Sequence, residues 1–164
     1  ADAAVAAPLA AERYSLEVLA DDIADTPGAV TRFVLVSRPT SPPPVTGADR
    51  TSVVAYIADD HPGALLELLT ELAVRGVNLT RIESRPTGVG LGRYCFSIDA
   101  EGHIGQERVG EALAAMKRIC ADVRFLGSYP AADQTPLVER AGTNDGDVET
   151  AKRWVESLRS GPQA

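Results

Sequence analysis

Regular hydrophobic patterns fill the chain from Thr51 to Pro130. Apolar residues recur at helical spacing in two segments, which predicts amphipathic helices over residues 61–76 and 106–120. Other segments are apolar on both faces or alternate between apolar and polar positions, which predicts β-strands over residues 51–59, 77–86, 91–100 and 122–130. Gly88 to Gly92 predict a hairpin turn between the second and third strands. The order βαββαβ predicts an α+β fold of the ferredoxin-like kind, with both helices on one face of an antiparallel sheet.

Residues 1–38 carry a less regular pattern. The chain begins without Met and is rich in Ala, like the inside of a helix, so we expect a piece of a longer protein. Strand-like segments follow over Leu16–Ala20 and Val30–Ser37. One helix and two short strands cannot bury each other well, which predicts an incomplete domain. Residues 39–50 are rich in proline, which predicts a stiff, extended linker before the domain at 51–130.

Residues 131–164 form a polar tail with one predicted helix over residues 147–159. Within this helix, Trp154, Val155 and Leu158 either dock on a neighbouring surface or belong to a frayed chain end. The sequence pattern does not decide between these alternatives.

Composition narrows the classes of function. The 164 residues are 45% hydrophobic, which is enough for one or two small cores but not for a large enzyme. The net charge is -7, and no basic run is present that could follow a phosphate backbone, which argues against nucleic acid as a partner. The sequence shows neither an apolar stretch of the roughly 20 residues that span a bilayer nor the pattern of a signal peptide. These features predict a cytoplasmic chain that acts away from membranes.

The cysteines and histidines give no clear sign of a cofactor. Cys95 and Cys120 lie outside any C-x-x-C pattern, so buried thiols are favoured over a metal or redox site, and we predict no cofactor and no metal. His61 and His103 are expected to be turn residues without a partner.

The strand "NLTRIESRP", residues 78–86, is unusually polar at its end and closes with a proline. The exposed face of a half-buried strand needs only to be soluble, so a polar cluster of this kind predicts a binding site. The alternative is a solvated strand end. This segment and Gly63-Ala64-Leu65 at a helix start together resemble the phenylalanine-binding ACT domain, over Thr51 to about Pro130. Such domains occur in aromatic amino-acid hydroxylases and in prephenate dehydratases.

The segment from Ala10 to Val36 resembles the end of a prephenate dehydratase catalytic domain, and Thr31, Arg32 and Phe33 match its Thr-Arg-Phe triplet. The resemblance implies that Thr31 hydrogen-bonds the departing hydroxide, and Arg32 could supply donors to a dicarboxylate substrate while Phe33 walls the pocket. The alternative is that this segment is simply a buried strand.

The ACT resemblance also implies a site for free L-phenylalanine. The helix start at Gly63 offers backbone N–H groups and a partial positive charge to the carboxylate of the amino acid. Asn78 can donate and accept hydrogen bonds, while Glu83 and Arg85 pair with each other or with a second subunit. The expected site residues are His61, Pro62, Gly63, Ala64, Leu65, Asn78, Leu79, Ile82, Glu83, Ser84, Arg85 and Pro86.

Taken together, the resemblances imply the C-terminal part of a prephenate dehydratase, a lyase that converts prephenate to phenylpyruvate, water and carbon dioxide in phenylalanine biosynthesis. The chain itself is expected to carry the L-phenylalanine-sensing domain, to form a homodimer or tetramer, and to be inactive alone. The alternative is a non-catalytic amino-acid sensor, such as the regulatory part of a hydroxylase or a stand-alone receptor.

Overall fold

A computed structural model describes residues 2–26, 28, 30–87 and 94–161. The chain divides into two compact units, Ala1–Pro39 and Thr40–Ala164. No helix in the described residues is both long enough and apolar enough to cross a membrane. The two units are described separately below.

The described residues of the first unit form one short helix, α1 (Pro8–Tyr14). Pro8 suits the first turn of this helix, and Ser15 ends it in a left-handed conformation. The prediction of strands over Leu16–Ala20 and Val30–Ser37 is wrong, because the described residues there form no strand. A strand needs a hydrogen-bonded neighbour, and apolar side chains of the second segment are exposed instead, among them Val30, Phe33, Val34, Leu35 and Val36.

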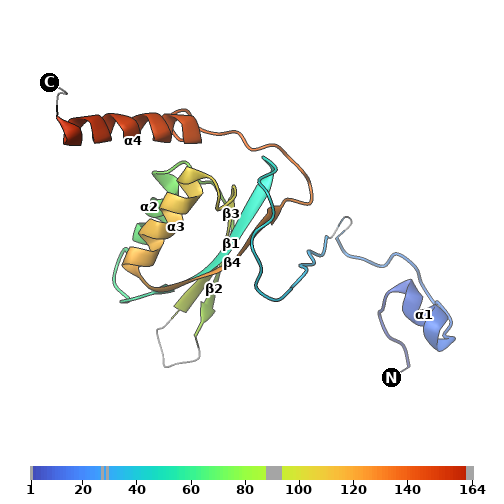
Figure 1. Cartoon of the computed structure of the whole chain (residues 1–164). Coiled ribbons are helices and arrows are strands. Elements are labelled where there is room, and N and C mark those ends of the chain that lie inside the picture. The colour runs from blue at the N-terminus through green and yellow to red at the C-terminus, as the bar shows by residue number, and fades with distance from the viewer. Residues whose placement is uncertain (1, 27, 29, 88–93, 162–164) are drawn as a thin grey trace. The chain divides into compact units, whose positions relative to one another are not determined.

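The second unit has the predicted βαββαβ order. Its elements are β1 (Asp49–Ile57), α2 (Ala64–Ala73), β2 (Leu79–Pro86), β3 (Tyr94–Glu101), α3 (Glu107–Ile119) and β4 (Cys120–Pro130). The strands form one sheet in the order β2-β3-β1-β4, and all neighbouring pairs are antiparallel. Helices α2 and α3 lie on the same face of this sheet (Figure 1). The expected α+β, ferredoxin-like fold is therefore confirmed.

The first strand begins at Asp49 rather than at Thr51. The buried carboxylate of Asp49 accepts hydrogen bonds from the backbone N–H groups of Thr46 and Gly47, at 2.8 and 3.1 Å, and from the Thr46 hydroxyl at 2.8 Å. These hydrogen bonds hold residues 46–49 in a turn, so the end of the predicted linker (residues 39–50) is ordered and leads directly into β1. The hairpin turn predicted at Gly88 to Gly92 lies outside the described residues.

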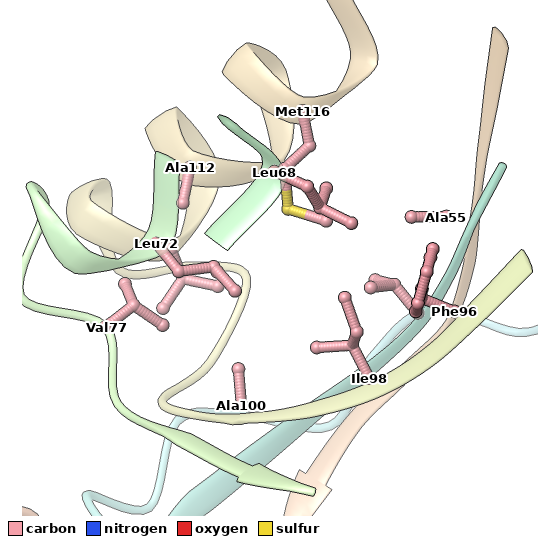
Figure 2. Close-up of a cluster of buried hydrophobic side chains, with 11 residues drawn as sticks. Ala55, Leu68, Leu72, Val77, Phe96, Ile98, Ala100, Ala112 and Met116 are labelled. Carbon is pink, nitrogen blue, oxygen red and sulfur yellow. The ribbon is translucent and has the colours of Figure 1, made fainter. Parts of the chain in front are cut away.

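The core lies between the two helices and the sheet. Figure 2 shows side chains of α2 and α3 directed at side chains of the strands. The cluster contains Val53, Ala55, Leu68, Leu72, Val77, Phe96, Ile98, Ala100, Val109, Ala112 and Met116. Spacing along α2 buries Leu68 and Leu72, whereas Leu65 on the same helix remains 38% exposed. The helix therefore has apolar surface beyond what the core covers.

The tail carries α4 (Asp145–Ser160), which includes the predicted helix. Asn144 caps its start by accepting a hydrogen bond from the Asp147 N–H at 2.9 Å. The helix meets the start of α3, where the Asp145 carboxylate accepts a hydrogen bond from the Glu107 N–H at 2.9 Å and Lys152 pairs with the Glu107 carboxylate. Its apolar side chains Trp154 and Leu158 are exposed, so α4 is held by polar contacts.

We predict that Leu68→Ala lowers the free energy of unfolding by about 2–5 kcal/mol, because it leaves a cavity in the core. Leu68 is 1% exposed, whereas Leu158 in α4 is 61% exposed, so Leu158→Ala serves as the control with an expected change of about 0.5 kcal/mol or less. Urea unfolding followed by circular dichroism measures both values. Equal losses would contradict the placement of the core.

Candidate functional site

An open hollow of about 680 Å³ lies where β1 ends and α2 begins. Its lining comes from the β1–α2 connection, the first turns of α2 and the start of β3, and consists of Ile57, Ala58, Asp59, Asp60, His61, Gly63, Ala64, Leu65, Leu66, Leu69, Tyr94 and Phe96. The hollow thus combines apolar side chains with carboxylates, an imidazole and the end of a helix.

Gly63 shapes the helix end of this hollow. Its φ of 96° turns the chain sharply into α2, a conformation that other L-residues adopt at a cost. A Cβ at this position would meet nothing within 4 Å, so the space in front of the backbone is open. Because the first turn of a helix leaves backbone N–H groups without helical partners, this end can receive a carboxylate.

His61 stands beside this helix end and has two partners. Its Nδ1 lies 2.9 Å from the Asp59 carbonyl oxygen, and its Nε2 lies 3.1 Å from Glu67 Oε1. The hydrogen bond to Glu67, followed by the Asp59 carbonyl, raises the pKa of His61. The expectation that His61 lacks a partner is therefore wrong, because the turn before α2 folds the ring back onto the first turn of the helix.

His103 is also paired, contrary to expectation. It is buried, and its Nδ1 accepts a hydrogen bond from the Gly105 N–H at 2.9 Å. This contact shapes the loop before α3. No group of three metal-binding side chains gathers around either imidazole in the described ranges.

Strand β2 brings only one of its ends near the hollow. Pro86 pairs with Tyr94 and Ser84 pairs with Phe96, and both of these β3 residues line the hollow. Leu79 pairs instead with Ala100, which itself pairs with Thr51 near the opposite end of β1. Over the 8 residues of β2, at roughly 3.3 Å per residue, the two ends are on the order of 20 Å apart.

Asn78, just before β2, therefore lies at the opposite end of the sheet from Gly63. Its carbonyl oxygen accepts a hydrogen bond from the Glu101 N–H at 2.8 Å, which ties it to the end of β3. One copy of the chain does not bring Gly63 and Asn78 together, as a site at the junction of the two motifs would need. Pro62 was also expected in the site. It lies in the β1–α2 connection, between His61 and Gly63, which both line the hollow.

The charged residues of β2 pair with one another. Glu83 Oε2 lies 3.1 Å from Arg85 Nη2, and Glu83 Oε1 lies 3.1 Å from Arg81 Nε. The two guanidinium groups, that of Arg81 first, hold the pKa of Glu83 below its ordinary value. The expected pairing of Glu83 with Arg85 is thus present within one chain.

Apolar side chains of the hollow and of strand β2 are only partly covered. Leu65 and Ile82 are each 38% exposed and Tyr94 is 48% exposed. In the sheet, Ile82 lies opposite the fully buried Ile98. Its exposure shows that the helices do not extend over β2, and an apolar surface remains open there.

Thr31, Arg32 and Phe33 lie in the first unit on a segment without regular secondary structure. The Phe33 side chain is 88% exposed, so it encloses no pocket among the described residues of this unit. The triplet is accordingly not assembled into an enclosed site within the described part of this unit.

Tyr94 and Phe96 were not among the expected site residues. Alternation along the strand places them on the same face as Ile98, which indicates burial rather than function. Their position beside the helix start follows from the pairing of Cys95 with Tyr56 near the end of β1. The only signal in the sequence was an aromatic pair at the start of a strand, and that signal is weak.

Comparison with known proteins identifies both parts of the chain. The ACT domain family matches residues 52–118, and the prephenate dehydratase family matches residues 1–41. The prephenate dehydratase of Mycobacterium avium (strain 104) is 56% identical over 161 residues, which are 98% of this chain and 49% of that protein. Over nearly its whole length, this chain is similar to the C-terminal part of prephenate dehydratases. It spans about half the length of the curated relatives that it matches.

Solved structures agree with this relation. The structure of a prephenate dehydratase from Arthrobacter aurescens, in complex with L-Phe, is 56% identical and superposes with a TM-score of 0.86, covering 93% of this chain and 50% of that one. A structure described as a novel type of quorum quenching acylase is 33% identical with a TM-score of 0.54, over 58% of this chain and 34% of that one. The resemblance to prephenate dehydratases and the ACT fold are confirmed.

We predict that the His61–Glu67 contact depends on pH. Because the folded-state pKa of His61 is raised, the contact is complete below the ordinary histidine pKa and is lost as the pH rises through the raised value. An NMR titration of the ring should give a pKa above the ordinary value, and Glu67→Gln should lower it. Glu71→Gln is the control, since Glu71 pairs with Arg75 at 2.6 Å. A pKa at or below the ordinary value in the unaltered chain would refute the contact.

Proposed function

We propose that this chain is the regulatory part of a prephenate dehydratase and binds L-phenylalanine through its ACT domain. The observation that carries the proposal is the hollow at Gly63, which joins an anion-accepting helix end to apolar and aromatic side chains. A relative that is 56% identical holds L-Phe in its structure. The match of residues 1–41 to prephenate dehydratases favours this function over the sensor of a hydroxylase or a stand-alone receptor.

The chemistry of the hollow suits a free aromatic amino acid. The carboxylate meets the N–H groups at the start of α2, where Gly63 lets the ligand approach the backbone. The ring packs against Leu65, Tyr94 and Phe96. An apolar wall of this kind solvates a ring hydroxyl less well than water does, so tyrosine is expected to bind less well than phenylalanine.

A second copy of the chain completes this site in our proposal. Strand β2 is an edge of the sheet, and Ile82 on this strand and Leu65 on α2 both leave apolar surface open. Antiparallel pairing of β2 with the same strand of a second copy, about a two-fold axis, brings Asn78 of the partner subunit beside the Pro86 end of β2. That is the end nearest the hollow. The assembly is therefore a homodimer, or a tetramer built from such dimers.

We propose further that the full-length parent converts prephenate to phenylpyruvate. Loss of carbon dioxide and of the ring hydroxyl releases hydroxide, and a hydrogen bond from Thr31 stabilises this leaving group until it takes a proton and becomes water. Arg32 supplies donors to the substrate carboxylates, and Phe33 closes the pocket. In this chain the triplet is exposed, so the chain alone does not enclose the substrate. We propose that a protein with such a biosynthetic role acts in the cytoplasm.

We predict that calorimetry detects binding of L-phenylalanine by this chain, with weaker binding of tyrosine and leucine. Asn78→Ala should weaken phenylalanine binding by roughly 1–3 kcal/mol, because a ligand group loses its partner. Asn144→Ala, at the start of α4, is the matched control and should leave the affinity unchanged. Absence of heat and of thermal stabilisation at millimolar phenylalanine would reject the site, and equal affinity for leucine would reject its selectivity.

Mixed dimers test whether two subunits share the site. If Gly63 of one copy and Asn78 of the other form each site, a dimer of one Gly63→Ala chain and one Asn78→Ala chain contains one unaltered site and one doubly altered site. This mixed dimer can be purified by giving the two chains different tags. It should bind L-phenylalanine tightly, with half as many ligand molecules per dimer as the unaltered dimer binds. If each chain forms its own site, the mixed dimer binds no ligand tightly. A stable monomer in sedimentation would also reject the shared site.

We predict that Thr31→Ala in the full-length enzyme lowers kcat much more than it changes KM, since the hydroxyl acts on the leaving group in the transition state. Thr31→Ser should retain most of the activity, because it keeps the hydroxyl. Phenylpyruvate formation followed by its absorbance measures both variants. A normal kcat for Thr31→Ala would remove Thr31 from the mechanism.

A further inference from the structure

An oxygen atom lies against each ring nitrogen of His61. The Asp59 carbonyl oxygen is 2.9 Å from Nδ1, and Glu67 Oε1 is 3.1 Å from Nε2. A carbonyl oxygen and a carboxylate oxygen can only accept hydrogen bonds, whereas a neutral imidazole carries a single N–H donor. Both contacts are therefore hydrogen bonds only when both ring nitrogens carry protons, so the geometry around His61 suits the cation.

His61 lies where two hollows adjoin. It lines the large hollow at Gly63 and also a smaller hollow of about 120 Å³. The two hollows have further lining residues in common, at the end of β1, in the β1–α2 connection and at the start of α2, namely Ile57, Ala58, Asp59 and Ala64. Glu67 lines only the smaller hollow. The imidazole is thus part of the proposed effector site, and its carboxylate partner stands just outside that site.

The His61–Glu67 pair is also close to the helix end proposed for the ligand carboxylate. The Glu67 N–H donates to the Gly63 carbonyl oxygen at 2.9 Å, and the Ala64 N–H donates to the His61 carbonyl oxygen at 3.1 Å. Both partners therefore belong to the first turn of α2 and the residues that lead into it, where four residues of helix rise only about 6 Å. This length is within the screening length of about 8 Å at physiological ionic strength, so the charge of the imidazole acts on a carboxylate held there.

Acidic side chains dominate the charge around these hollows. Among the described residues, the titratable side chains that line the two hollows besides His61 are Asp59, Asp60, Glu67, Tyr94 and Cys120. Carboxyl groups ordinarily titrate well below neutral pH, and phenols and thiols above it; burial raises the pKa of Cys120 further. Lys117, whose charge acts on Cys120, is paired with Asp122 at 2.6 Å. From about pH 5 to about pH 8, His61 is thus the lining residue whose charge changes.

We propose that the His61–Glu67 pair links effector binding to pH, so that L-phenylalanine binds more tightly when the His61 ring is a cation. This inference rests on the proposed function, because it describes the regulation of that same site. The cationic ring offsets the carboxylates of Asp59 and Asp60 and attracts the carboxylate of the ligand at the start of α2. Once the proton is lost, only acidic charges remain around the hollow. Glu67 is a positioning residue, since it acts on the ligand through His61.

The sign of the effect follows from the contacts of the ring. The hydrogen bond to Glu67 is the main cause of the raised pKa of His61, so the cation persists to higher pH than in an isolated histidine. Phenylalanine binding should therefore be strongest below the ordinary histidine pKa and weaken as the pH rises through the raised value.

Calorimetry of the full chain with L-phenylalanine tests this proposal. Over the range from about pH 5 to about pH 8, the affinity should fall by about two- to fivefold, as expected for one charge in exposed surroundings. In His61→Gln, which carries no titrating ring, the affinity should stay constant over the same range. A pH dependence that persists in His61→Gln, or an affinity that rises with pH in the unaltered chain, would overturn the proposal.

Glu67→Gln tests the positioning role. It keeps the shape of the side chain and removes its charge, so the midpoint of the pH dependence should move to lower pH together with the pKa of His61. Glu71→Gln is the matched control, because it makes the same change one turn later on α2, outside the lining of both hollows. This control should leave the midpoint in place. An unmoved midpoint in Glu67→Gln, or an equal shift in both variants, would overturn the role of Glu67.

A further readout needs no variant. Because linkage between two binding events is reciprocal, saturating phenylalanine should raise the pKa of His61, measured by NMR, by the logarithm of the ratio of the low-pH and high-pH affinities. A pKa that does not respond to the ligand would overturn the proposal. A chain that binds no phenylalanine at any pH refutes the proposed function, whereas binding of equal affinity at every pH refutes only this inference.

Discussion

The packing of α2 and α3 against one face of the sheet is the constraint on which the rest of the domain depends. Leu68 and Met116 are buried against Ile98 and its neighbours (Figure 2), and this apolar contact fixes which face of every strand is internal. Because only a short connection joins β1 to α2, a helix packed on this face must begin beside the end of β1. The hollow at Gly63 is thus a result of the fold's connectivity, and its polar groups lie at element ends where backbone groups remain available.

The same packing leaves surfaces without cover. The helices reach over β1 and β3 but leave apolar side chains exposed near β2, including Ile82. The opposite sheet face carries polar residues that satisfy one another, such as Ser52 and Asp99. An exposed edge with apolar surface on one face and fixed charges on the other is well suited to pairing with a second copy, because register and orientation are both specified.

The sequence was sufficient to predict the elements of the second unit but not the distances between its motifs. Leucine spacing predicted α2, and alternation predicted the strands, because these patterns are local. The separation of Asn78 from Gly63 depends on how β2 and β1 align with β3, which no local pattern encodes. The strand expected at Val30–Ser37 failed for a related reason, since a strand forms only with a partner.

The contacts of the C-terminal tail make it an integral part of the domain rather than an appendage. The guanidinium of Arg108, 3% exposed, lies 3.7 Å from the Glu139 carboxylate of the tail, and Asp145 receives the first N–H of α3. A protease cut after Pro130 would separate from the domain both the counter-charge of the buried Arg108 and a cap of α3. The minimal folding unit therefore extends beyond the residues of the ACT match, and limited proteolysis of the native protein should spare the junction at Ala131.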